Sequence, residues 1–94
     1  MARERQIEEK LYKAVKQKGG LALKFVSPGY DGVPDRLILL KNGRVGFVEV
    51  KSPGKEPRPL QRSRIKKLKE LGFKVYVLDN ENQIGGIIDE ISSA

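Results

Sequence analysis

The sequence contains no cysteine and no histidine. Without cysteine, a disulfide framework, a thiolate nucleophile and a cysteine-ligated zinc site are excluded, and a reducing compartment is compatible. Without histidine, a Ser-His-Asp triad, a histidine general base and an imidazole metal ligand are excluded as well. Any catalysis must therefore use carboxylates, lysine, tyrosine, serine and a bound metal ion.

Long apolar runs are also missing. None approaches the roughly 20 residues that a helix needs to cross a bilayer, and residues 1–5 lead into no signal-peptide core. We therefore expect a cytoplasmic protein that does not use a membrane as a partner.

Basic residues outnumber acidic ones. The 94 residues include 19 Lys and Arg against 12 Asp and Glu, which gives a net charge of +7 and a pI near 9.8. Such a surface favours a polyanion, most often nucleic acid, because each neutralised phosphate releases a condensed counterion. The alternative is that excess lysine only keeps a small protein soluble. The length suits a single domain over residues 1–94.

The apolar pattern predicts an α/β fold. Residues 4–18 have the periodicity of an amphipathic helix, and a second helix is predicted from Pro59 to about residue 71. The segment 82–91 is ambiguous, since two glycines weaken a helix there, and we expect a short helix to begin after Gly86. Strands are predicted at residues 21–26, 35–40, 44–51 and 73–78. This order predicts a mixed four-stranded sheet with helices on both faces.

The connection at Asn42-Gly43 is a strong hairpin signal. A two-residue turn would place Asp35 opposite Val50 and leave Glu49 on the other face of the sheet. A three-residue loop with Gly43 in a left-handed conformation pairs Leu40 with Arg44 and places Asp35 directly across from Glu49. We predict the three-residue loop, because the alternative separates the charged side chains.

Two carboxylates and one ammonium group are thereby predicted to meet at the ends of two strands. Glu49 and Lys51 continue the apolar face of Val45 and Phe47, and a carboxylate in that setting needs a neutralising partner. Asp35 and Glu49 could both bind a divalent cation such as Mg²⁺, with the Val50 carbonyl as a third ligand. Lys51 could then orient or deprotonate a water molecule or stabilise the phosphate. The alternatives are a neutral Asp–Glu pair, an Asp–Lys ion pair, or an ordinary solvated Lys51.

Two helical residues are candidates to complete this site. Glu8 lies beside the apolar stripe of the first helix, although most glutamates in such a run are solvated. Gln61 falls within the apolar arc of the second helix, where an inward amide needs a partner. Basic residues surround that helix and form a plausible surface for the DNA backbone; they are Lys55, Arg58, Arg62, Arg64, Lys66, Lys67 and Lys69. A solvated lysine face is the alternative, for Lys66 and Lys69 in particular.

At these residues the chain resembles the virus-type replication-repair nuclease (VRR-NUC) domain of the PD-(D/E)xK nuclease superfamily. The resemblance is carried by Gly32-Val33-Pro34-Asp35-Arg36, by Phe47-Val48-Glu49-Val50-Lys51 and by Pro57-Arg58-Pro59-Leu60-Gln61. It extends from Ile7-Glu8 to about residue 80. A bare PD…ExK pattern is weak evidence, but its combination with the loop and the helix start is specific.

The resemblance implies a restriction-endonuclease-like fold and cleavage of phosphodiester bonds that depends on Mg²⁺ or Mn²⁺. It implies that Glu8, Asp35 and Glu49 serve the metal, that Lys51 is the catalytic lysine and that Gln61 lines the site. It further implies a stand-alone homodimer that acts on branched DNA such as Holliday junctions, and it is compatible with a virus-encoded protein acting in the host cell. Lys55, Arg58, Arg62 and Arg64 are our candidates for DNA binding.

Two other functions remain open from the sequence. A non-catalytic basic module that binds DNA or RNA would use the same charges, with the acidic residues in structural roles. A nuclease specific for DNA ends or mismatches would share the chemistry and differ only in its substrate.

Overall fold

The computed structural model describes residues 2–93. Its helices and strands follow the predicted order, and they are α1 (Ala2–Gln17), β1 (Leu21–Lys24), β2 (Arg36–Leu40), β3 (Arg44–Val50), α2 (Pro59–Glu70), β4 (Lys74–Leu78) and α3 (Ile84–Ser92). Short 3₁₀ turns lie at Lys41–Gly43 and Glu81–Gln83. The α/β class is confirmed, and most element ends differ from the prediction by one or two residues.

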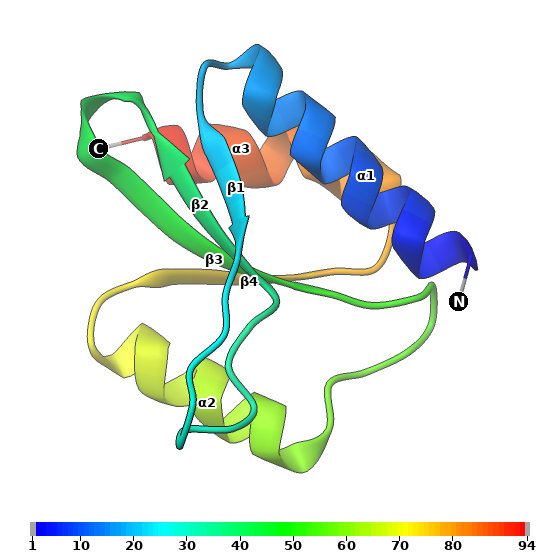
Figure 1. The fold of residues 1–94 in the computed structure, drawn as a ribbon, viewed down its shortest axis with the longest axis vertical. Coiled ribbons are helices and arrows are strands. Elements are labelled where there is room, and N and C mark those ends of the chain that lie inside the picture. The colour runs from blue at the N-terminus through cyan, green and yellow to red at the C-terminus, as the bar shows by residue number, and fades with distance from the viewer. Residues whose placement is uncertain (1, 94) are drawn as a thin grey trace.

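The four strands form one mixed sheet in the order β1-β2-β3-β4. The pairs β1–β2 and β2–β3 are antiparallel, whereas β4 runs parallel to β3. A parallel pair needs a long crossover connection, and α2 provides it. Figure 1 shows α1 and α3 on one face of the sheet and α2 on the other. Within residues 2–93, no helix is both long enough and apolar enough to span a bilayer.

The larger core lies between the sheet and the α1/α3 layer. Its buried residues come from both helices and all four strands, and they are Ile7, Leu11, Val15, Ala22, Ile38, Val48, Val50, Leu78, Ile84, Ile87, Ile88 and Ile91. Its members are spaced i, i+4, i+8 on α1 and i, i+3, i+4, i+7 on α3, as expected for one face of an amphipathic helix. This core fixes β3 as the central, buried strand.

The α2 side of the sheet has a smaller core rich in aromatic rings. It contains Phe47, Ile65 and Val75. The Phe47 ring lies 5.4 Å from that of Phe25 and 5.8 Å from that of Phe73, between ring centroids. Because side chains alternate along β3, the next residue on this face after Phe47 is Glu49. The small core therefore ends where the charged residues begin.

The hairpin between β2 and β3 has the predicted register. Leu40 pairs with Arg44, and Asn42 and Gly43 both have positive φ angles, 66° and 70°. β2 begins at Arg36, which pairs with Val48. Asp35 precedes it directly, so continuing the same register places Asp35 across from Glu49.

The predicted start of the last helix was wrong. α3 begins at Ile84 and includes both Gly85 and Gly86 in its first turn. Each glycine disfavours a helix by about 1 kcal/mol relative to alanine. Four isoleucines of α3 are buried against the sheet and α1, and burying a side chain of that size contributes about 1.5–3 kcal/mol. Burial therefore outweighs propensity.

We predict that Gly46→Ala destabilises the fold. An added Cβ at Gly46 would lie 2.6 Å from Cδ1 and 2.7 Å from Cγ1 of the buried Ile91. Overpacking of this kind lowers the free energy of unfolding by about 1–3 kcal/mol, which urea denaturation would measure. Adding Ile91→Val removes the Cδ1 atom and should restore part of the loss. Purely additive losses in the double variant would contradict this contact.

Candidate functional site

Glu49 is a buried charged residue near the end of β3. Its side chain is 1% exposed, and it lies on the α2 side of the strand. The three residues before it, Gly46 to Val48, are buried as well. A carboxylate in this position requires partners, because desolvation of an unpaired charge costs several kcal/mol.

Asp35 reaches the same place from the start of β2. Its Oδ2 accepts a hydrogen bond of 2.8 Å from the Val50 N–H, and its own carbonyl accepts one of 2.8 Å from the Phe25 N–H. These bonds hold Asp35 between β1 and β3. In an extended strand the N–H and C=O of one residue point to the same side, so the Val50 carbonyl also faces the Asp35 side.

One oxygen of Glu49 is held by two partners. Lys51 Nζ lies 3.0 Å from Glu49 Oε2, and Gln61 Nε2 donates a 2.9 Å hydrogen bond to the same oxygen. Gln61 Oε1 accepts a 2.9 Å bond from the Arg58 N–H at the start of α2, which orients the amide. The structure therefore brings Asp35, Glu49 and Lys51 together, here called the strand-end cluster, with Gln61 beside it.

The other oxygen of Glu49 is less well satisfied. Glu49 Oε1 is buried and accepts no hydrogen bond of normal geometry from any of residues 2–93. Buried carboxylate oxygens are normally satisfied, and such an exception marks strain or a missing ion. A hard divalent cation accepts carboxylate and carbonyl oxygens, so the residues present fit such a cation at Glu49 Oε1, with Asp35 and the Val50 carbonyl as further donors.

Burial raises the pKa of both carboxyl groups. For Glu49 the main cause is desolvation, and the negative charge of Asp35 raises its pKa further, whereas Lys51 and the backbone N–H of Asp35 lower it. For Asp35 desolvation again dominates, opposed by the Val50 N–H, while Glu8 adds repulsion. A bound cation would lower both pKa values again, because its positive charge stabilises the two ionised carboxylates.

Glu8 is engaged elsewhere. Its Oε2 accepts a 2.9 Å hydrogen bond from Arg36 Nε, and Arg36 also donates to the Ala22 carbonyl at 3.0 Å. Among residues 2–93, no group of three or more Asp, Glu, His or Cys side chains is arranged to hold a metal. The role of Glu8 at the metal therefore stays a prediction. Sequence reasoning missed Arg36, although a lone arginine opening the apolar strand Arg36–Leu40 was a signal.

The four residues proposed for DNA binding lie on or just before α2. Lys55 and Arg58 are exposed, and Arg62 is exposed with Glu56 at 3.8 Å. Arg64 differs, because it is half-buried and contacts the loop before β2: its Nε donates a 2.7 Å hydrogen bond to the Asp31 carbonyl. The first three are exposed and can meet a phosphate, with Arg62 in an exposed ion pair with Glu56, whereas Arg64 has a partner in the loop before β2.

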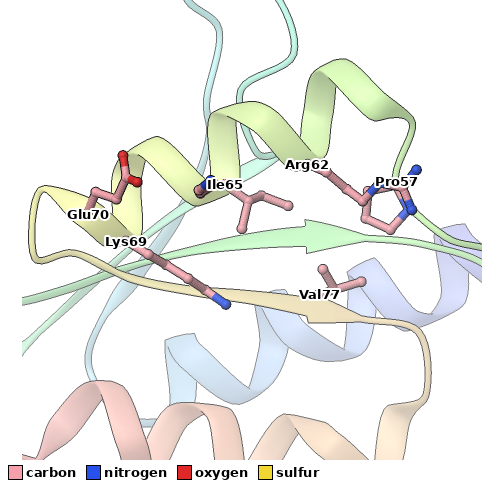
Figure 2. A pocket seen from close by; sticks show the side chains of 7 residues that line it. Pro57, Arg62, Ile65, Lys69, Glu70 and Val77 are labelled. Atoms are coloured by element: carbon pink, nitrogen blue, oxygen red, sulfur yellow. The ribbon is translucent and has the colours of Figure 1, made fainter.

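An apolar groove between α2 and β4 is separate from the strand-end cluster. Figure 2 shows Ile65 and Val77 pointing toward one another across it, with Pro57 and Arg62 at one end and Lys69 and Glu70 at the other. None of its lining residues belongs to the strand-end cluster. We therefore place the candidate active site at the cluster, where titratable groups converge.

Two carboxylates and a lysine at adjoining strand ends of a mixed sheet flanked by helices define the class of PD-(D/E)xK nucleases. Comparison with known proteins gives the family: the chain matches the VRR-NUC domain over residues 4–81. The chain belongs to the VRR-NUC family, which supports nuclease activity.

Individual relatives agree with this assignment. The chain is 49% identical over 82 residues to a protein of Acyrthosiphon pisum secondary endosymbiont phage 1 named "Putative nuclease p44", covering 87% of this chain and 88% of that protein. It also superposes on a solved VRR_NUC domain with a TM-score of 0.87 and 28% identity, covering 93% of this chain and 95% of the other. The resemblance expected from the motifs is confirmed.

We predict that Asp35→Asn leaves the metal-free protein at least as stable as the wild type while abolishing cleavage. Asparagine keeps an oxygen for the Val50 N–H but removes one negative charge beside buried Glu49. Because the folded pKa of Asp35 is raised, the wild type loses stability from this group as pH rises through that pKa. The advantage of asparagine should therefore grow from acidic to neutral pH.

Thermal unfolding in EDTA at several pH values would measure this advantage. A melting temperature well below that of the wild type at neutral pH would show that the repulsion is not relieved by the substitution.

Proposed function

We propose that this protein is a metal-dependent endonuclease that hydrolyses phosphodiester bonds in branched DNA such as Holliday junctions. The observation that carries the proposal is Glu49: one oxygen is held by Lys51 and Gln61, and the other is buried next to Asp35 and accepts no hydrogen bond of normal geometry from residues 2–93. This arrangement suits a cation and a phosphate at the same place. The match to the VRR-NUC domain supports it.

Mg²⁺ or Mn²⁺, when bound, would supply a more acidic water molecule and neutralise charge on the phosphate. The residues of the chain provide the rest. Asp35 and Glu49 hold the cation, with the Val50 carbonyl and Glu8 as further candidates. Gln61 fixes the orientation of the Glu49 carboxylate through its bond to the Arg58 N–H.

Lys51 has the position expected of the catalytic lysine. Its ammonium group lies 3.0 Å from Glu49, and its side chain is 18% exposed. There it can orient the attacking water or stabilise the charge that develops on the phosphate oxygens as the P–O bond to the leaving sugar breaks. Water supplies the oxygen that replaces the leaving group.

The DNA backbone would lie along the N-terminal half of α2. Lys55, Arg58 and Arg62 are exposed there, next to the strand-end cluster. Phosphate contacts of this kind position a nucleic acid without reading its sequence.

We further propose a homodimer, because one domain with one cluster would cut one strand per encounter and a junction requires two cuts. Light scattering of the purified protein with and without DNA tests the dimer. A cytoplasmic location stays a prediction.

Lys51→Ala should separate the enzyme from a non-catalytic binding module. We expect cleavage of a four-way junction in Mg²⁺ to fall at least ~100-fold, a typical loss for one group that stabilises developing charge, while DNA binding is retained. Lys13→Ala, at an exposed lysine of α1, is the matched control. EDTA should abolish cleavage by the wild type. If the wild type cuts no linear, flapped or branched DNA in Mg²⁺ or Mn²⁺, the binding module is the better explanation.

Arg62→Ala should weaken DNA binding without altering the chemical step. The affinity of the wild type should fall steeply with added salt, and the variant should lose about one unit of the slope of log Kd against log salt concentration. Fluorescence anisotropy in EDTA measures this, with Lys13→Ala again as the control. A salt response that is flat in the wild type would mean that the basic surface does not dock DNA.

A further inference from the structure

The loop between β1 and β2 is anchored on α2. Figure 1 shows the chain after β1 running across to α2 before it returns into β2. At its tip the Asp31 carbonyl accepts the 2.7 Å bond from Arg64 Nε. Gly32, with a φ of +88°, packs so closely that an added Cβ would lie 2.9 Å from Leu60 Cγ and 3.3 Å from Arg64 Cγ. The tip of this loop is therefore held by α2.

Tyr30 sits on this tip with its ring backed by a guanidinium group. Arg64 Cζ lies 3.9 Å from the centroid of the Tyr30 ring, which is the geometry of a cation–π stack. The residue nevertheless remains 41% exposed. The stacked guanidinium group therefore does not bury the residue, and about two-fifths of its surface stays accessible. An aromatic side chain is thus held by α2 while it remains partly exposed.

Tyr12 shows what an ordinary surface tyrosine looks like in this protein. It is 46% exposed on α1, and Lys16 Nζ lies 6.0 Å from the ring centroid. A lysine ammonium on a flexible stem at that distance holds the ring far less firmly than a stacked guanidinium does. α1 also lies on the face of the sheet opposite α2. Tyr12 is therefore a matched control for Tyr30.

The fixed ring lies near the strand-end cluster. Tyr30 is followed by Asp31–Pro34 and then by Asp35, so the chain cannot separate the two residues by more than roughly 17 Å. Helix α2 also connects Tyr30 to the cluster. Gln61, which bonds to Glu49, and Arg64, which stacks on Tyr30, lie three residues apart on the same side of α2. One turn of α2 thus supports both the ring and the cluster.

We infer that Tyr30, backed by Arg64, is a stacking platform for an unpaired nucleobase next to the scissile phosphate. Single-stranded nucleic acids are bound in this way, because every base has a π face and stacking needs no sequence readout. A paired base inside a duplex cannot offer its face, so the platform would favour substrates in which a base at the branch is exposed. This inference rests on the proposed DNA substrate and names the feature of that DNA which the protein selects.

The test uses the intact protein in EDTA, so that it does not depend on cleavage. The probes are a fully paired duplex and a branched duplex with one unpaired nucleotide at the branch, each with 2-aminopurine at the same position. We expect the wild type to quench the unpaired 2-aminopurine on binding. Tyr30→Ala should lose that quenching and bind the branched probe about tenfold more weakly, as expected for one lost stacking contact, with duplex affinity unchanged. Tyr30→Phe should behave like the wild type.

Two further variants keep the result interpretable. Tyr30→Leu keeps an apolar side chain on the loop without a π face and should also lose the quenching, even if Tyr30→Ala loosens the loop. Tyr12→Ala should change neither probe. Quenching that persists in both Tyr30→Ala and Tyr30→Leu, or an equal loss of affinity for both probes, overturns the platform alone. A wild type that binds neither probe overturns the proposed function together with it.

Discussion

The structure depends on a carboxylate that is kept away from water. Glu49 is held inside the α2 face of β3, just beyond the aromatic core formed around Phe47. A buried carboxylate needs a counter-charge and hydrogen-bond donors. Lys51 and Gln61 provide these at Oε2, whereas Oε1 accepts no hydrogen bond of normal geometry from residues 2–93. The surrounding apolar packing makes that need stronger, because charges interact more strongly where water is excluded. This imbalance is what supports the proposed cation site.

Helix α2 links this constraint to the rest of the molecule. Its apolar side packs Ile65 against the sheet, its first turn supplies Gln61 to Glu49, and Arg64 one turn later holds the loop that leads into Asp35. The crossover that makes β4 parallel to β3 is therefore also the support for both carboxylates. Catalytic groups placed on such packed elements are held more precisely than groups on free loops.

The two carboxyl groups proposed for function lower the stability of the metal-free fold when they are ionised. Desolvation raises the pKa of both Asp35 and Glu49, which means that their charged forms are disfavoured in the metal-free fold. The larger core between the sheet and the α1/α3 layer can offset this, since it buries twelve apolar residues on the opposite face. A strained functional site supported by a well-packed core is a common division of roles in small enzymes.

By itself the sequence determined the order of the elements through its apolar periodicity. It predicted the hairpin register only on the condition that Asp35 and Glu49 share a face of the sheet, since Asn42-Gly43 also suits a two-residue turn. It could not place α3, since burial of four isoleucines outweighs the two glycines only once the sheet exists to bury them. Only the tertiary structure decided that Glu8 pairs with Arg36 and that Arg64 stacks on Tyr30. Those contacts join residues distant in sequence, where many partners are chemically equivalent and packing alone selects among them.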